Sequence, residues 1–257
     1  MPSVLAIAAH PDDIEFVMCG TLLLLKQRGW NIHYFNIADG GLGSSVLDLE
    51  ACVATRLEEA RQAAGQLEAK FYPPIGRDMQ LVYSPSLLSK VVAVVRQARP
   101  SIVLTHSPID YMEDHQCACR LAVSAAFARG MPNLISDPPV APILGDVAIY
   151  HAQPHGNVTP LGETVTPDFW VDIQAVLDQK ESALACHQSQ GQWLEESQAM
   201  DSYLQGMRQL SLECGRLSKV FSAAEGWRRH HHLGFCVPGF DPLTQTLSDL
   251  IQSAKFA

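Results

Sequence analysis

The stretch Val4-Leu5-Ala6-Ile7-Ala8-Ala9-His10-Pro11-Asp12-Asp13 decides the fold that we expect. Its first six residues are an uninterrupted apolar run without the alternation of a half-exposed strand, which is typical of a parallel strand buried on both faces. The charged residues begin where this run ends. After them, the segment 14–28 is apolar around most of its surface and stops at Gly29, as a buried helix with a glycine C-cap would. A second strand at residues 31–38 completes a β-α-β unit.

The same alternation of strand and helix continues along the chain. Helices are expected at residues 48–66, 85–98, 116–129 and 176–188, and strands at residues 70–72, 101–105, 147–151 and 169–173. This order predicts an α/β fold with a doubly wound, mainly parallel, Rossmann-like sheet flanked by helices. We expect one domain over residues 1–257 with a C-terminal helical or extended tail, because no repeat or linker divides the chain. Residues 227–234 are expected to form an edge strand or a basic surface.

Composition excludes several classes of protein. The net charge of -9 argues against a nucleic-acid or anionic-membrane partner. No apolar stretch approaches the length of a membrane span, and Val4 to Ala9 is too short for the core of a signal peptide. The seven cysteines contain no C-x-x-C pair, and Cys117 and Cys119 point apart on a helix, so free thiols in a reducing compartment are expected. These features predict a cytoplasmic protein.

Two clusters of acidic residues and histidines follow predicted strands. The first is His10 to Asp13 with Glu15 close behind, and the second runs from His106 to His115. Ligands of open α/β sheets bind outside the carboxyl ends of the strands, where both clusters fall. Grouping these side chains beside apolar strands is costly unless a cation compensates their charge. The sequence therefore predicts a divalent-metal site.

The residue types favour a catalytic site over a structural one. Nitrogen ligands from His10 and His115 with an oxygen from Asp13 would leave a position open for water, as in catalytic zinc sites. Asp12 would then act as general base on that water. The same ligands also accept iron, manganese or cobalt. For His106 a hydrogen-bonded turn is the commoner role of a lone histidine, and Asp110 or Asp114 would serve equally well as a helix N-cap.

At these residues the sequence resembles the PIG-L, or LmbE-like, family of zinc-dependent N-deacetylases. The family motif A-H-P-D-D-x-E is intact at residues 9–15. Three further segments resemble family motifs: R-x-x-E-x-x-x-A-A from Arg56, K-x-x-A-L-x-x-H-x-S-Q from Lys180, and A-E-x-F/W within residues 221–226. The resemblance covers most of the chain.

The resemblance also implies roles for individual residues. Zinc would be held by His10, Asp13 and His115, with Asp12 as general base. Beside this set we assign Asp114 as a second catalytic carboxylate that orients a ligand or the base. Substrate contacts would come from Arg56 and from the loop at Asp39 and Gly40. Family members commonly remove acetyl groups from N-acetylglucosaminyl conjugates, releasing acetate and a free amine.

One position departs from the family pattern. Many members carry D-x-H-x-D-H in the second cluster, where the first histidine stabilises the oxyanion or protonates the leaving amine. Met112 occupies that position here, and its thioether can do neither. Candidate replacements are Tyr111, His106, His151 and His155.

Other conspicuous residues carry weaker interpretations. The run His230 to His232 suggests basic surface more than metal binding, and His187 suggests packing near the pocket wall. Trp170, Trp193 and Trp227 are able to stack on a sugar, although most tryptophans fill cores or interfaces. The chain lacks G-x-S-x-G, and its glycine loop lacks the G-x-G-x-x-G spacing, which excludes a serine hydrolase of that type and a dinucleotide site.

The sequence thus predicts a zinc-dependent N-deacetylase that acts on a small N-acyl amino-sugar conjugate, in a chain for which a homo-oligomer is an open option. Two alternatives remain open. Met112 favours a metal-dependent amidase on a non-sugar substrate. A catalytically silent, metal-stabilised binding protein would show the same ligands without turnover.

Overall fold

The computed structural model describes residues 1–198 and 203–254, and the strands of these residues form one mixed sheet in the order β3-β2-β1-β4-β5-β7-β6-β8. The strands are β1 (Ser3–Ala8), β2 (Asn31–Asn36), β3 (Lys70–Tyr72), β4 (Ile102–Thr105), β5 (Ala148–Ala152), β6 (Phe169–Asp172), β7 (Ala224–Arg229) and β8 (Ile251–Ser253). From β3 to β5 all neighbours are parallel, with Ala6 opposite Tyr34 on one side and Leu104 on the other. The predicted doubly wound, mainly parallel sheet is confirmed.

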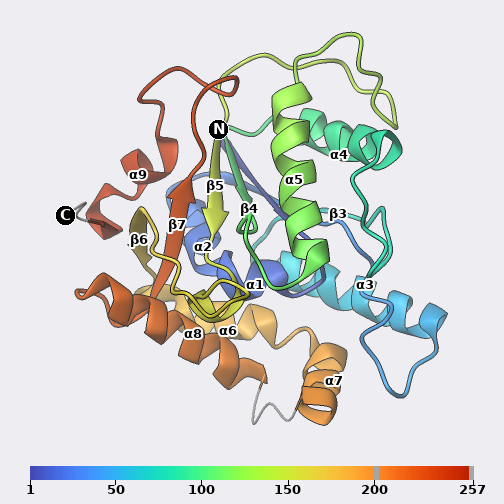
Figure 1. The fold of residues 1–257 in the computed structure, drawn as a ribbon, viewed down its shortest axis with the longest axis vertical. Helices are drawn as coiled ribbons and strands as arrows, with labels where there is room; N and C mark the ends of the chain where they lie inside the picture. Colours follow the sequence, from blue (N-terminus) through green and yellow to red (C-terminus); the bar gives the residue numbers. More distant parts are fainter. Residues whose placement is uncertain (199–202, 255–257) are drawn as a thin grey trace.

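Helices cover both faces of this sheet (Figure 1). They are α1 (Asp13–Val17), α2 (Cys19–Gln27), α3 (Leu49–Gln66), α4 (Pro85–Ala98), α5 (Glu113–Ala128), α6 (Leu177–Leu184), α7 (Gln188–Gln198), α8 (Tyr203–Ser218) and α9 (Pro242–Thr246), with 3-10 turns η1 (His155–Asn157), η2 (Gln174–Val176) and η3 (Ser248–Leu250). Helices α4 and α5 pack on the face that carries Leu5 and Ile7, whereas α1, α2, α3, α6 and α8 pack on the face of Val4, Ala6 and Ala8. Every residue of β1 from Val4 onward is therefore buried, which explains its continuous apolar sequence.

The second half of the sheet is antiparallel. Strand β7 lies between β5 and β6 and runs against both, and β8 pairs with β6 at the edge. The prediction of an edge strand at residues 227–234 is therefore wrong. The indole of Trp227 is wholly buried and donates to the hydroxyl of Thr21 at 3.0 Å. A strand that carries such a buried side chain is favoured in the interior of the sheet, with a neighbouring strand on each side. The residues after Arg229 leave the sheet.

The single helix expected over residues 14–28 is two helices, α1 and α2, that meet at Met18 (φ -134°). The second begins against a buried carboxylate: Glu225 accepts the backbone N–H groups of Gly20 and Thr21, each at 2.8 Å. This contact from a strand far along the chain satisfies donors that the first turn of a helix leaves unpaired. A periodicity argument confined to residues 14–28 does not reveal it.

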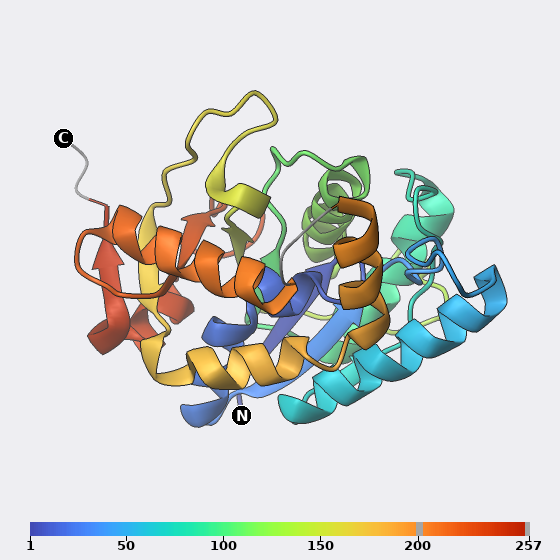
Figure 2. The same ribbon diagram turned by 90° about the horizontal axis from the view of Figure 1, so that it is seen from below.

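Two other helices differ from the predicted bounds. Helix α5 begins at Glu113, three residues earlier than expected, with Met112 as its N-cap residue and no side-chain cap. The helix predicted over residues 176–188 is η2 followed by α6, and α7 then begins separately at Gln188. Helix α7 stands between α3 and α8 and contacts both (Figure 2). None of the helices in the described residues is long and apolar enough to cross a bilayer.

Candidate metal centre and pocket

The two predicted clusters meet at the carboxyl ends of β1 and β4. These neighbouring parallel strands lie where the strand order reverses direction, since β2 and β3 extend to one side of β1 and β5 to the far side of β4. Such a switch point leaves a crevice between the outgoing loops. The loop after β1 carries His10 and Asp12 and leads into α1 at Asp13, and the loop after β4 leads into α5, which carries His115.

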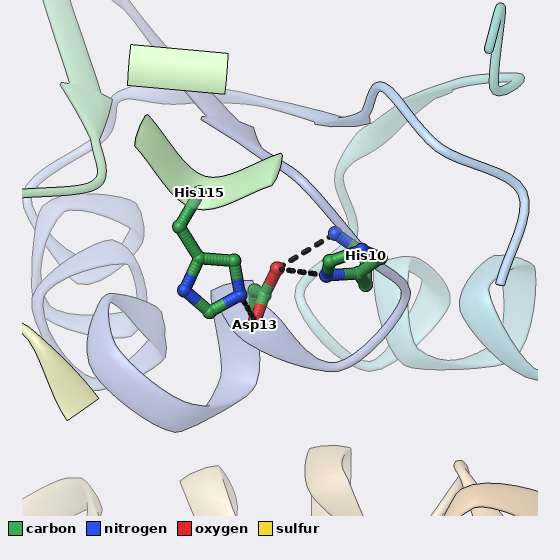
Figure 3. Close-up of side chains that lie close together, drawn as sticks. All are labelled: His10, Asp13 and His115. Atoms are coloured by element: carbon green, nitrogen blue, oxygen red, sulfur yellow. Dashed lines mark hydrogen bonds and ion pairs between the residues drawn. The ribbon is translucent and has the colours of Figure 1, made fainter. Parts of the chain in front are cut away.

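His10, Asp13 and His115 converge on one point (Figure 3). Oδ2 of Asp13 lies 3.4 Å from Nδ1 of His10, and Oδ1 of the same carboxylate lies 3.2 Å from Nε2 of His115. One ligand atom from each residue lies within 4.8 Å of the other two. Two imidazole nitrogens and a carboxylate oxygen at this spacing fit a divalent transition metal with room for further ligands.

A carboxylate holds the outer nitrogen of each histidine. Nε2 of His10 lies 3.2 Å from Oδ2 of Asp114, and Nδ1 of His115 lies 2.9 Å from Oδ1 of Asp110. Partners of this kind fix the tautomer and the ring orientation of metal-binding histidines. Asp114 lies where it is able to orient the ring of His10. Asp110 has the equivalent position toward His115, and neither aspartate caps α5.

The electrostatics of the cluster are those of a cation site. Burial alone would lower the pKa of His10, but Asp114 and Asp13 raise it to about 9. In the same way the charge of Asp13 and the hydrogen bond to Asp110 raise the pKa of His115 to about 10 against the effect of burial. The two histidines in turn help to hold the pKa of Asp13 well below its ordinary value despite burial. The carboxylates thus favour positive charge at this point.

Asp12 lies beside the cluster in a strained conformation. Its φ of 112° is rare for a residue with a side chain, and strain of this kind often marks functional sites. Burial raises the pKa of its carboxyl to about 6, although Arg56, with Nη2 at 3.8 Å from Oδ2, acts in the opposite direction. A buried carboxylate of this pKa is ionised at neutral pH and still basic enough to accept a proton.

Arg56 is buried and fixed by backbone carbonyls. Its Nη2 donates to the carbonyl of Pro11 at 2.5 Å, and its Nη1 donates to the carbonyl of Gly40 at 3.3 Å. Gly40 has φ +74°, and a Cβ there would lie 2.7 Å from Nε of Arg56, so only glycine fits this close approach. The glycine loop therefore holds the arginine.

A cavity of about 270 Å³ opens above these residues. Aromatic, apolar and polar side chains line it together: His10, Asp12, Asp13, Phe16, Leu42, Gly43, Arg56, Asp78, Met79, Tyr111, Met112, His115, His155, Gln190, Trp193 and Leu194. The ring of His155 lies 5.8 Å from that of Tyr111 and 5.5 Å from that of Phe16. A pocket with aromatic walls and a charged floor is typical of sites for small polar ligands.

Four predicted site residues are absent from the lining of this pocket: Asp39, Gly40, His106 and Asp114. His106 is buried behind His115, with its ring stacked at 4.2 Å, and its Nε2 accepts the backbone N–H of Ala9 at 2.9 Å. His106, Asp110 and His115 also lie within ligand distance of one another, and in this second group Nδ1 of His115 already contacts Oδ1 of Asp110 at 2.9 Å. Asp39 and Gly40 shape the loop, whereas the next residues along, Leu42 and Gly43, form the wall.

Sequence reasoning missed several pocket residues. Asp78 accepts the N–H groups of Gly40 at 2.8 Å and Leu42 at 3.2 Å, and it lies 4.0 Å from Nε2 of His10. Its position in the segment that follows β3 was an available signal. Gln190 reaches the wall from α7, and Tyr203, at the start of α8, donates to Asp12. The family segment that begins at Lys180 ends at Gln190 and so marks that residue, although without a role in the pocket. Nothing local in the sequence marks Tyr203, because the fold brings it from the C-terminal half.

The remaining histidines and tryptophans lie either in the pocket wall or in the buried core of the protein. Trp193 lines the pocket, while Trp170 and Trp227 are buried in the sheet. His151 is buried and contacts His230 at 2.9 Å, away from the pocket. His187 is buried 3.3 Å from Glu15.

Known proteins with similar sequences include a sugar deacetylase and a hydratase. Residues 5–127 match the PIG-L family, described as GlcNAc-PI de-N-acetylase. The chain is 29% identical over 195 residues to the diacetylchitobiose deacetylase of Thermococcus kodakarensis, covering 73% of this chain and 69% of that protein. It is also 31% identical over 196 residues to the 4-oxalmesaconate hydratase of Pseudomonas putida, covering 72% of each.

Solved structures share the fold. The N,N'-diacetylchitobiose deacetylase of Pyrococcus horikoshii superposes with a TM-score of 0.74 at 25% identity, over 94% of this chain and 88% of that one. The family match begins at Leu5 within β1 and includes the loop that carries His10 to Asp13 and all of α5 except its last residue. The chain is an enzyme of the PIG-L deacetylase family.

Proposed function

We propose that this protein is a metal-dependent deacetylase that removes the acetyl group from the nitrogen of an amino-sugar conjugate. The observation that carries the proposal is the convergence of His10, Asp13 and His115 with Asp12 beside them in one pocket. The sugar deacetylases among its relatives, from Thermococcus kodakarensis and Pyrococcus horikoshii, support this substrate class.

His10, Asp13 and His115 would hold the metal, for which zinc is our choice. When bound, a divalent cation supplies Lewis-acid polarisation of the acyl carbonyl and lowers the pKa of water near it. Asp114 and Asp110 keep the ligating nitrogens of the two histidines aimed at that point.

Asp12 would remove the proton from the water that attacks the acyl carbon. Its carboxyl is ionised at neutral pH and reaches the pocket from the strained turn after β1. General base catalysis of this type typically contributes about 10²- to 10⁴-fold to the rate. Arg56, anchored by Pro11 and Gly40, keeps this turn in place and favours the charged form of the base.

The oxyanion and the leaving nitrogen need donors, and Met112 provides none. Tyr111 and His155 are the pocket side chains that we assign to this role. Burial raises the pKa of the Tyr111 hydroxyl, so that it stays protonated and able to donate. Burial and the charge of His115 lower the pKa of His155, which leaves a neutral imidazole with one N–H donor at pH 7.

The walls favour a sugar over a flat or strongly charged ligand. Phe16, Tyr111 and Trp193 present aromatic surface, on which the apolar face of a sugar ring packs. The carboxylate of Asp78 offers an acceptor for hydroxyl groups.

Hydration of a carbon–carbon double bond is the second candidate, because the 31% identical relative is a hydratase. The same base and metal would serve that reaction. An oxalmesaconate carries several carboxylates, however, and needs cationic partners. Two nitrogens of the Arg56 guanidinium already donate to backbone carbonyls, which leaves less of it for a substrate carboxylate. Three aspartates in the pocket would also repel such a substrate, so we place this function second.

The test is a substrate screen on protein loaded with one equivalent of zinc. Acetate release is measured from N-acetylglucosamine, its β-linked disaccharide and alkyl glycosides, and hydration of 4-oxalmesaconate is followed in parallel. We expect acetate from at least one sugar, with Asp12→Asn losing about 10³-fold while retaining the metal. Hydration without acetate release would assign the second function. A zinc-loaded protein without any turnover would favour a binding protein.

A further inference from the structure

The hydroxyl of Tyr203 makes a short hydrogen bond to Asp12. Its Oη donates to Oδ2 at 2.6 Å, and both side chains are more than nine-tenths buried. The two residues stand 191 positions apart, Asp12 after β1 and Tyr203 at the first position of α8. The contact therefore ties the C-terminal half of the chain to the pocket.

This contact divides the two oxygens of the carboxylate between different tasks. Oδ2 takes the Tyr203 hydroxyl and lies 3.8 Å from Nη2 of Arg56. Among the described residues, no side chain or backbone group forms a hydrogen bond with Oδ1. A carboxylate held through one oxygen presents the other in a fixed direction, as a general base requires.

The ring of Tyr203 is itself held in place. It packs edge to face on Phe16, with centroids 5.2 Å apart and planes at 61°. A Cβ added to Gly191 of α7 would lie 3.4 Å from its Cδ1, which places the start of α7 against the ring. Because Asp12 has a strained φ of 112°, its carboxylate needs such outside support to keep one orientation.

We propose that Tyr203 is a positioning residue, which fixes Oδ2 of Asp12 so that Oδ1 faces the attacking water. This inference rests on the proposed function of Asp12 as general base. Burial raises the pKa of the Tyr203 hydroxyl well above its ordinary value, so it remains a donor throughout the working range of pH.

Tyr203→Phe tests the proposal, because it keeps the ring against Phe16 and removes only the oxygen. We expect kcat to fall about 10- to 100-fold, since a misplaced catalytic group loses rate more than affinity. KM should stay within about twofold and zinc content should remain one ion per chain. Tyr150→Phe is the matched control, because Tyr150 also donates to a carboxylate, Asp241, at 2.6 Å, and neither residue lines the pocket.

A second readout does not depend on turnover. Thermal unfolding is measured for Tyr203→Phe, Asp12→Ala and the double variant, because alanine at position 12 leaves no acceptor for the Tyr203 hydroxyl. Coupling through the hydrogen bond predicts that the double variant shifts Tm by clearly less, or more, than the sum of the two single shifts. Additive shifts in Tm would show that the hydrogen bond between Tyr203 and Asp12 does not contribute to stability, and would overturn the proposal.

The two readouts separate failure of this inference from failure of the proposed function. If the wild-type protein releases acetate and Tyr203→Phe keeps its kcat within twofold, Tyr203 does not position the base. A fall in kcat accompanied by loss of zinc, or matched by Tyr150→Phe, would likewise reject it. If the wild-type protein hydrolyses nothing, the proposed function fails, and the unfolding measurements still accept or reject the contact.

Discussion

Met112 stands where the family pattern has a histidine, so the proton donor must come from another residue of the pocket. The thioether lines the cavity at the N-cap position of α5 but has no hydrogen to donate. His155 belongs to η1, after β5, and enters the same cavity. We therefore expect His155 to carry part of the work that the family histidine does elsewhere.

His155→Ala should lower kcat/KM for acetate release by about 10²- to 10³-fold, the usual effect of removing one oxyanion donor. His155→Gln retains an N–H donor and should lose less. Adding Met112→His to His155→Ala should restore part of the rate, because it returns a donor to the family position. Steady-state kinetics on zinc-loaded variants would check this. An unchanged rate for His155→Ala would assign the role to Tyr111 instead.

Metal uptake should release protons, with a sign that follows from the raised histidine pKa values. At pH 7 the apoprotein holds His10 and His115 protonated, since their pKa values are about 9 and about 10. Ligation requires neutral imidazoles, so binding one zinc should release about two protons at pH 7 and tighten as pH rises toward 9. Calorimetry in buffers of different ionisation enthalpy counts these protons. A count near zero would show that the histidines are not the ligands.

Three further family motifs act at the scale of elements, because their side chains join one element to another. Glu59 of α3 accepts the N–H of Ser189 at 2.9 Å and its hydroxyl at 2.6 Å, which fastens the first turn of α7 to α3. Lys180 of α6 donates to Glu225 of β7 at 2.7 Å in the core. The R-x-x-E, K-x-x-A-L and A-E segments therefore form the frame around the pocket.

Glu225 should be among the costliest side chains to change. It accepts Lys180 and the N–H of Gly20 through Oε1, and the N–H and hydroxyl of Thr21 through Oε2. Glu225→Gln leaves the buried lysine charge without compensation and should lower the free energy of unfolding by about 3–5 kcal/mol, measured in urea.

Asp249→Asn supplies the comparison for Glu225→Gln, because Asp249 pairs with Arg28 at 2.7 Å on the exposed surface. Solvent screens such pairs, so we expect no measurable change in stability there. If both variants lose the same stability, the buried pair has no special weight.

Local pattern was sufficient to predict the parallel half of the sheet and the loop residues at its carboxyl edge. An apolar run followed by His10 to Asp13 marks both a buried strand and its functional end. The antiparallel half was not predictable in this way, because Trp227 and Glu225 take their partners from α2. The role of Tyr203 was not predicted for the same reason, because its partner Asp12 lies 191 residues away. The contacts that were missed are those between distant segments, which no window of sequence contains.

At the scale of the whole molecule, a bound cation would join α5 to the turn that leads from β1 into α1. His10 and Asp13 belong to that turn and His115 belongs to α5, so the ion would cross-link segments about a hundred residues apart in sequence. Zinc at a hundredfold excess over its dissociation constant adds about 2.7 kcal/mol to the free energy of unfolding, which raises Tm by about 5–10 °C in a chain of this size. We expect chelation to lower Tm by this amount and leave the far-UV circular dichroism at 25 °C unchanged, because Asp13 still pairs with both histidines. Asp13→Asn should lose the dependence of Tm on zinc, whereas Tyr150→Phe should keep it. A Tm that zinc does not change in the wild-type protein, or a zinc shift that persists in Asp13→Asn, would place the metal somewhere other than this cluster.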